Sequence, residues 1–344
     1  MKKLLVVLMV LTIAFGAVFA QGSGESGRVA RSKFVLYTTC NDAQLEALIP
    51  PFEQQYPQYD VDIVTGGAGE LVAKLTAERD NPQADAILGA LTYEGVKGYM
   101  SFIEPFQTAS VSEYPSYAVD PTGYLNPYAM QISVFVVNKD LEKELGFEIT
   151  GYDSLLDPRL KGKIITADPT ASSSAWGHLV NMEEIYGGLG SAGFNKYLND
   201  FITNLNGVIT NSSSTVYKQV MNGEYVVGLS YESAITQLLL DGADNIRVLY
   251  PKEGSIVGMF ATAAVKNAKN MDAAKAFVEW VVSLEGQDQY ATNYGGRPVH
   301  PQVPINPILQ PLETINLLDY DKVGVGDTTS QIKEAWTNAW ARIN

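Results

Sequence analysis

Short apolar runs and helical patterns alternate along the first part of the chain. Apolar runs bounded by turn residues predict strands at Lys33–Thr39, Val61–Val64 and Ala84–Leu88. Between these runs, apolar residues recur at helical spacing on one face of each of two helices: Leu45, Leu48, Ile49 and Phe52, then Leu71, Val72 and Leu75. The order strand, helix, strand, helix, strand predicts a parallel sheet, and therefore an α/β fold.

A second alternation follows a strand at Gln131–Asn138, which is rich in β-branched residues and long enough to pass between two domains. The further predicted strands are Ile164–Ala167, Val208–Ile209, Tyr225–Leu229, Ile246–Tyr250 and Met259–Val265. The predicted helices are Asn181–Ile202 with an interruption at Gly187-Gly188, Tyr217–Met221, one from about Ala234, Met271–Leu284 and Ser330–Ile343. A chain of 344 residues with two alternations suits two domains of about 150 residues each.

Four turns rich in hydroxyl groups stand at predicted strand ends, at residues 38–41, 170–174, 212–215 and 230–233. In an α/β sheet, ligands bind beyond the carboxyl ends of the strands. Hydroxyl groups beside the unpaired N–H groups of a helix N-terminus can bind an anion, because the helix dipole adds about half a positive charge there. The alternative is an ordinary helix cap with spare serines. Together, the four turns favour a polar cleft that recognises hydroxyl groups and anions.

Two residues of the last turn are further candidates for this cleft. Glu232 closely follows a predicted buried strand, so we expect its carboxylate to face the cleft and accept hydrogen bonds from sugar hydroxyls or an amine. The alternative is a negative charge at a helix N-terminus, which the helix dipole favours by roughly 0.3–1 kcal/mol. Tyr231 would stack on a ligand or donate its hydroxyl, with plain packing as the alternative.

The N-terminus has the pattern of a secretory signal peptide. Lys2-Lys3 is the basic part, Leu4–Phe15 the apolar part, and Ala17–Ala20 a small-residue cleavage site. The apolar run is too short to span a membrane. We therefore expect a signal peptide at residues 1–20, a flexible Gly/Ser-rich leader at 21–32, and export of the protein to the periplasm.

Charge and cysteine content narrow the possible partners. Removal of residues 1–20, which carry two lysines and no acidic residue, changes the formal net charge from −14 to −16. Such an acidic protein is not expected to bind nucleic acid or anionic membranes. A local anion site is still compatible with this charge, because charges are screened within about 8 Å at physiological salt. The single cysteine, Cys40, predicts no internal disulfide and a small buried residue rather than a nucleophile.

The sequence contains no recognisable catalytic or metal-binding motif. Neither His178 nor His300 has a His or carboxylate partner at ligand spacing, and His178 is expected to be an ordinary helix residue. A G-x-S-x-G elbow is absent, and no base is evident near Ser173 or Ser230. The glycine run Gly66–Gly69 lacks the spacing of a nucleotide-binding loop and indicates a close backbone approach or a plain turn. We therefore expect no enzymatic activity, no resident metal and no cofactor.

Several segments resemble those of family 1 extracellular solute-binding proteins, the capture subunits of ABC importers. They are VLYTTCNDAQ, ADPTASSSAWGHL, NGEYVVGLSYESAI, PKEGSIVGMFATAAVKNAKN and AAKAFVEWVVS, and the resemblance covers about residues 33–300. It is strongest to the branch that binds ferric ion, phosphonates and hexose phosphates. It implies a two-lobed α/β fold, the type II periplasmic-binding-protein fold, with two crossing hinge strands near Tyr128–Val136 and Gly254–Thr262. The implied division is residues 33–130 and 262–300 for lobe 1, 131–261 for lobe 2, and 301–344 for a C-terminal loop and helix.

The resemblance also bears on the ligand. The serine-rich turn is similar to the phosphate-holding turn of phosphonate and sugar-phosphate binders, and Tyr231-Glu232 is similar to their hydroxyl-reading position. Ferric members carry a tyrosine pair after the strand that corresponds to Tyr225–Leu229, whereas this chain has only Tyr231. Ferric members also often place a His or an acid where this chain has residues 38–41, and Fe³⁺ prefers anionic oxygen ligands.

We therefore expect a solute-binding subunit that captures a small anionic solute, first a hexose phosphate and second an organophosphonate. Ferric iron is the alternative ligand, a secreted phosphate-ester hydrolase is a more distant alternative, and an adhesive role is the most distant. The implied partners are the permease and ATPase subunits of the importer, and the protein is expected to be a monomer. The expected ligand-binding residues are Thr38, Thr39, Asn41, Ser172, Ser173, Ser174, Ser213, Ser214, Tyr231 and Glu232.

Overall fold

A computed structural model describes residues 31–319 and 322–344 of the chain, and Arg31–Asn344 form one compact unit. The predicted signal peptide and nearly all of the predicted leader lie outside the described residues. The predicted cleavage and export are therefore not visible in this structure. Among the described residues, no helix combines the length and the apolar character needed to cross a membrane.

The first lobe is built on the predicted parallel sheet. Strand β1 (Ser32–Thr38) pairs in parallel with β2 (Tyr59–Thr65) on one side and with β3 (Ala86–Leu91) on the other. The helices α1 (Asp42–Gln55) and α2 (Ala68–Ala77) connect these strands, as the sequence predicts. Helices α9 (Met271–Val282) and α10 (Leu284–Tyr294) complete the lobe, and Phe277 of α9 packs 5.2 Å from Phe34 of β1 between ring centroids.

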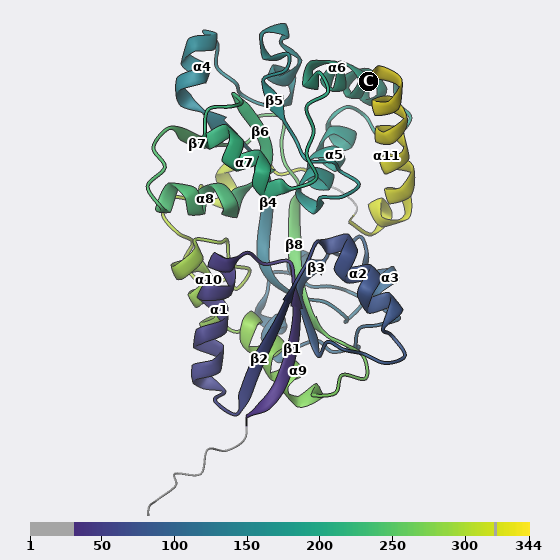
Figure 1. The fold of residues 1–344 in the computed structure, drawn as a ribbon, viewed down its shortest axis with the longest axis vertical. Coiled ribbons are helices and arrows are strands. Elements are labelled where there is room, and N and C mark those ends of the chain that lie inside the picture. The colour runs from purple at the N-terminus through teal and green to yellow at the C-terminus, as the bar shows by residue number, and fades with distance from the viewer. Residues whose placement is uncertain (1–30, 320–321) are drawn as a thin grey trace, which may run out of the picture. The chain divides into compact units, whose positions relative to one another are not determined.

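Two long strands cross from this lobe to the next. Strand β4 (Asn126–Asn138) is buried along all 13 residues. Its first half pairs antiparallel with β8 (Val257–Ala264), and its second half pairs antiparallel with β6 (Val227–Tyr231) and β7 (Ile246–Leu249). Strand β8 in turn pairs with β3 of the first lobe, so β4 and β8 join the two lobes (Figure 1). These strands overlap the crossings that the resemblance implied.

The second lobe adds a short strand, β5 (Ile164–Ile165), which pairs in parallel with β6. Its helices are α4 (Lys139–Leu145), α5 (Ser173–Ile185), α6 (Ala192–Leu205), α7 (Ser213–Met221) and α8 (Glu232–Leu240). The predicted helical region Asn181–Ile202 is divided into α5 and α6 around the predicted interruption at Gly187-Gly188, and it differs from the prediction in that α5 begins already at Ser173. The predicted strand at residues 208–209 is reduced to a single bridge between Ala167 and Thr210.

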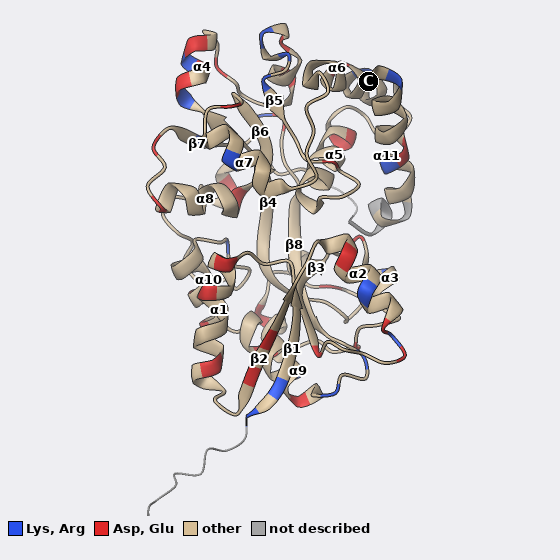
Figure 2. Cartoon of the chain, viewed as in Figure 1, with Lys and Arg blue, Asp and Glu red and all other residues tan. Residues whose placement is uncertain are grey.

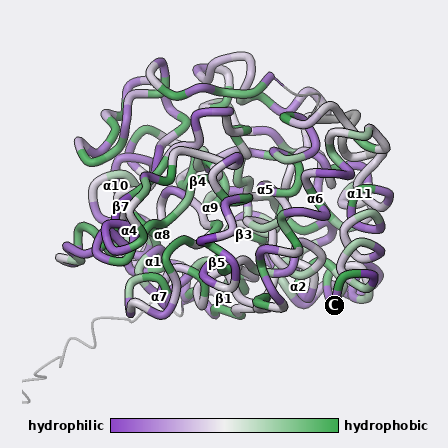
Figure 3. The backbone as a smooth tube through the Cα atoms, turned by 90° about the horizontal axis from the view of Figure 1, so that it is seen from above, coloured by the Kyte–Doolittle hydropathy of each residue, from purple (hydrophilic) through white to green (hydrophobic). Residues whose placement is uncertain are grey.

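The remaining elements are short or C-terminal. Helix α3 (Val96–Tyr99) has one turn, and 3-10 helices occur at Ala109–Glu113, Ser116–Ala118, Tyr152–Leu156, Pro158–Leu160 and Leu312–Thr314. Helix α11 (Lys322–Ile343) lies beside α6, with both hydrophilic and hydrophobic residues along it (Figures 1 and 3). Its residues Ile332, Trp336 and Ala339 are buried in the hydrophobic core of the second lobe. The C-terminal helix is thus part of that lobe's packing.

Candidate functional site

The N-termini of five helices converge on one cavity of about 220 Å³. The cavity is lined from the first lobe by residues that precede or begin α1 and α2, and from the second lobe by residues that precede or begin α5, α7 and α8. These residues are Thr39, Cys40, Gly66, Gly67 and Ala68 from the first lobe, and Ala171, Ser172, Ser173, Ser174, Asn211, Ser212, Ser213 and Tyr231 from the second. Strand ends of both lobes therefore meet at a single site, as expected for an α/β fold.

The five helix N-termini bring partial positive charge to the cavity, and three of these helices carry an acidic residue in the first turn: Asp42 in α1, Glu70 in α2 and Glu232 in α8. Each helix N-terminus carries about half a positive charge, and its first-turn N–H groups have no partner within the helix. Among the described residues that line the cavity, none is a lysine, an arginine or an acidic residue. Figure 2 shows charged residues on α4 and β2, and neither element contributes a residue to the lining. The arrangement favours a bound anion that accepts hydrogen bonds from backbone amides and hydroxyl groups.

Hydroxyl groups lie in pairs at two of these helix starts. The Oγ atoms of Ser172 and Ser174 are 3.1 Å apart, and those of Ser212 and Ser214 are 2.8 Å apart. Ser172 caps α5 by accepting from the Ala175 amide at a long distance of 3.4 Å. Ser173 is exposed in the cavity wall. These hydroxyls can rotate to donate to a ligand, because capping alone does not use them all.

Three predicted site residues lie beside the cavity and do not line it. Thr38 is buried, where its hydroxyl donates to the Leu88 carbonyl at 2.9 Å and accepts from the Cys40 amide at 3.0 Å. Asn41 caps α1 in a reciprocal pair with Gln44. Ser214 is paired with Ser212. These residues shape the turns that hold the cavity wall.

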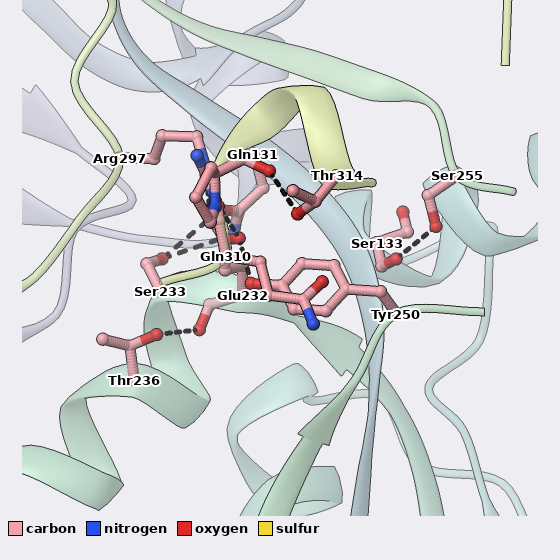
Figure 4. A network of polar contacts seen from close by, with 11 residues as sticks. Gln131, Ser133, Glu232, Ser233, Thr236, Tyr250, Ser255, Arg297, Gln310 and Thr314 are labelled. Atoms are coloured by element: carbon pink, nitrogen blue, oxygen red, sulfur yellow. Dashed lines mark hydrogen bonds and ion pairs between the residues drawn. The ribbon is translucent and has the colours of Figure 1, made fainter. Parts of the chain in front are cut away.

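Glu232 is placed differently from the expectation. Its two carboxylate oxygens accept from the Arg297 guanidinium at 2.9 and 2.8 Å, and the Tyr250 hydroxyl donates to it at 2.5 Å. Glu232 is fully buried, does not line the cavity, and lies in the network shown in Figure 4. The carboxylate is already paired in a buried ion pair, so its expected position facing the cleft is not observed, and its binding of the ligand stays a prediction. Its position in the first turn of α8 agrees with the alternative role at a helix N-terminus.

The crossing strands contribute residues that the sequence did not single out. Tyr128 of β4 and Phe260 of β8 line the cavity, together with Gln44 of α1. Tyr128 is buried, and its hydroxyl lies 3.7 Å from the Cys40 sulfur. Both strands have the apolar pattern of an ordinary core strand, so the sequence held no signal that would separate these two residues from packing residues.

The tyrosines of the cavity are neutral hydrogen-bond donors. Burial raises the pKa values of the Tyr128 and Tyr231 hydroxyls well above their usual value. Tyr231 packs edge-on against Tyr217 with 6.2 Å between ring centroids. Among the residues that the structure describes, no group of three or more His, Cys, Asp and Glu side chains could hold a metal ion. The site as built suits an anion better than a cation.

Two α/β lobes joined by two crossing strands around this cavity define a type II periplasmic binding protein, the class of solute-binding subunits of ABC importers. The chain belongs to the family of bacterial extracellular solute-binding proteins, whose model matches residues 47–311. The expected class, fold and branch are thereby confirmed.

Three known proteins show the range of its relatives. An uncharacterized protein of Haemophilus influenzae is 26% identical over 337 residues, which cover 93% of this chain and 94% of that protein. The structure of AfuA from Actinobacillus pleuropneumoniae with bound fructose-6-phosphate is 25% identical, with a TM-score of 0.81, and covers 90% of this chain and 98% of that one. Iron-bound HitA from Pseudomonas aeruginosa is 19% identical, with a TM-score of 0.75, and the match covers 89% of this chain and 99% of that one.

Proposed function

We propose that this solute-binding subunit captures a phosphorylated small molecule, with a hexose phosphate first and an organophosphonate second. The observation that carries the proposal is the convergence of five helix N-termini and paired serine hydroxyls on one cavity, whose described lining residues include no acidic side chain. The phosphate would bind the turn at Ser172–Ser174 and the facing turn at Thr39. Asn211–Ser213 and Tyr231 would bind the rest of the solute. The fructose-6-phosphate bound to AfuA supports the same class of ligand.

The experiment that tests this proposal is calorimetric titration with fructose 6-phosphate, an alkylphosphonate and inorganic phosphate. The double variant Ser173→Ala/Ser174→Ala should weaken binding of fructose 6-phosphate by at least about 100-fold. The reason is that each hydrogen bond to a charged group is worth about 1.5–3 kcal/mol. Equal affinity in the wild type and in the double variant would refute the assignment.

A matched control is available at another helix. Ser191 caps α6 by accepting from the Phe194 amide at 3.0 Å, and it does not line the cavity. Ser191→Ala should lower stability by about 1 kcal/mol through the lost cap and leave the affinity unchanged. A loss of affinity in this control would show that the serine effect is one of general stability.

Ferric iron is the second candidate, because HitA, a structural neighbour, holds iron. Iron would require Tyr231 and Tyr128 to ionise, against the raised pKa values that burial gives them. A tyrosinate–iron complex absorbs visible light. A protein that becomes coloured on loading with iron and does not bind fructose 6-phosphate would therefore support iron as the ligand in place of the phosphorylated solute.

We further infer that the protein binds its solute without transforming it, as a monomer that delivers it to a permease and ATPase. Cleavage after Ala20 would release the mature protein into the periplasm. Release of phosphate from p-nitrophenyl phosphate by the purified protein would overturn the first inference. Mass spectrometry of the exported protein, with a first residue other than Gln21, would overturn the predicted cleavage.

A further inference from the structure

The cavity continues into a second arm of the cleft, with a volume of about 450 Å³. The two spaces share the wall formed by Ala68, Ala171, Ser172 and Ser173, so they are continuous. The arm is lined by residues 90–99 of the first lobe, by the serine turn and Trp176 of the second lobe, and by α11. The cavity at the helix N-termini, at about 220 Å³, is smaller than typical ligand sites of about 300–1,000 Å³. A captured solute therefore has room to extend into the arm.

Helix α11 places one lysine in the wall of this arm. Lys333 is half-buried, and its Nζ lies 5.2 Å from the centroid of the Trp176 ring. Ile332 and Trp336, on either side of it in the helix, are buried in the core of the second lobe and hold α11 in place. Across the described part of the chain, the structure records no ion pair for Lys333. Burial lowers its pKa, which is the expected result for an ammonium group without a close counter-ion.

Among the described residues that line the arm, Lys97 and Lys333 are basic and Glu94 is acidic, so the lining carries one net positive charge. Glu94 and Lys97 line the same wall and carry opposite charges. Asp168 lies outside the lining, where its carboxylate accepts from the Thr170 amide and hydroxyl, each at 2.8 Å, and its negative charge offsets part of the charge of Lys333. Gly326 of α11 brings the helix backbone close to the first lobe at the edge of the arm, because a Cβ on Gly326 would come within 2.3 Å of the Glu94 carbonyl oxygen.

We propose that this arm is a second anion subsite, in which Lys333 binds a second acidic group of the solute whose phosphate occupies the helix N-termini. The inference rests on the proposed function and narrows it to sugars with two anionic groups, such as a bisphosphorylated hexose. An ammonium group gains most from an anion where water is partly excluded, and the half-buried position beside Trp176 provides that setting.

The test compares fructose 1,6-bisphosphate with fructose 6-phosphate by calorimetric titration. The wild-type protein should bind the bisphosphate at least about tenfold more tightly, as expected for one added charge-assisted hydrogen bond. Lys333→Gln should abolish this preference and leave the affinity for fructose 6-phosphate within about twofold of the wild-type value. Lys333→Arg retains the charge and should keep most of the preference.

The possible outcomes distinguish failure of the second anion subsite from failure of the proposed function. Tight binding of fructose 6-phosphate without a preference for the bisphosphate overturns the second subsite alone. A preference that survives in Lys333→Gln also overturns it, because another group would then provide the charge. Failure of both sugars to bind overturns the proposed function together with the inference. Circular dichroism of Lys333→Gln and Lys333→Arg establishes that both variants are folded before they are titrated.

Discussion

The imidazole of His178 is held in one neutral tautomer by its neighbours. Its Nε2 lies 2.7 Å from the Ser230 carbonyl, which can only accept, so this nitrogen carries the proton. Its Nδ1 then accepts from the Tyr152 hydroxyl at 2.7 Å, and that hydroxyl accepts from Asn181 at 2.7 Å. The chain of bonds fixes α5 to the end of β6, directly before Tyr231. His178 is thus a structural residue, as the sequence indicated.

The buried imidazole should make the protein sensitive to acid. Burial lowers the pKa of His178 to about 4, so the unfolded chain binds the proton first as the pH falls. The stability contributed by the neutral imidazole is complete above about pH 6.5 and is lost as the pH falls towards 4. Between pH 7 and pH 5 this group alone should remove about 2 kcal/mol from the free energy of unfolding.

Urea unfolding at pH 7 and pH 5 measures this loss. The variant His178→Gln should be less stable at pH 7, because it disturbs the bond to Tyr152. Its stability should nevertheless change less between the two pH values than that of the wild type. The same loss of stability in both proteins would mean that carboxylates, and not His178, cause the acid sensitivity.

Single residues show where sequence reasoning succeeds. Ser172–Ser174 could be placed at a strand end before a helix because that pattern is local, spanning about ten residues. The role of Glu232 could not be read in the same way, because its partner Arg297 lies 65 positions further along the chain. A carboxylate after a buried strand is compatible with a cleft or with an ion pair, and only the packing of distant segments decides between them.

The Glu232–Arg297 pair links three parts of the chain near the crossing strands. Glu232 begins α8, Tyr250 follows β7, and Arg297 follows α10 and donates to the Gln310 carbonyl at 2.7 Å. The backbone of Arg297 also bonds to Met130 of β4. The network therefore fastens α8 and the segment after α10 to the crossing strand (Figure 4). A role in holding these elements follows from its contacts.

Breaking this pair should cost far more stability than breaking an exposed one. Glu232→Gln leaves the Arg297 charge buried and uncompensated, which should destabilise the fold by about 3–5 kcal/mol in urea unfolding. The matched control is Asp200→Asn on α6, which removes an exposed partner of Lys196 and should cost less than about 1 kcal/mol.

The same variant tests whether Glu232 also binds the ligand. If the carboxylate is structural, the folded fraction of Glu232→Gln should bind fructose 6-phosphate with nearly wild-type affinity. A large loss of affinity with little loss of stability would mean that Glu232 binds the ligand.

Whole elements were foreseen to different degrees. The parallel sheet of the first lobe was predictable because its apolar runs and helical faces alternate without interruption. The contribution of β4 and β8 to the cavity floor was not predictable, because Tyr128 and Phe260 lie in strands whose residues are mostly apolar. The position of Lys333 was also hidden, since it depends on the docking of α11 against a helix more than 100 residues earlier in the chain.

The cavity takes its walls from both lobes and its floor from the strands that join them. Thr39 and Gly66–Ala68 belong to the first lobe, and Ser172–Ser174 and Asn211–Ser213 to the second. A solute that contacts both walls at once favours the arrangement in which the lobes lie closest, because only that arrangement satisfies both sets of contacts. Closure about β4 and β8 is the expected response to such a solute.

Small-angle X-ray scattering can distinguish a ligand that binds the wall of one lobe from a ligand that makes the two lobes close. Fructose 6-phosphate should reach both walls and lower the radius of gyration of the protein. Inorganic phosphate can occupy the serine turn but is too small to span the cavity, so it should compete for the site and leave the radius of gyration nearly unchanged. The Ser173→Ala/Ser174→Ala variant, at a concentration of fructose 6-phosphate that saturates the wild type, should also remain unchanged. Equal compaction with inorganic phosphate and with the hexose phosphate would mean that the phosphate alone draws the lobes together, and that the sugar contacts contribute no closure.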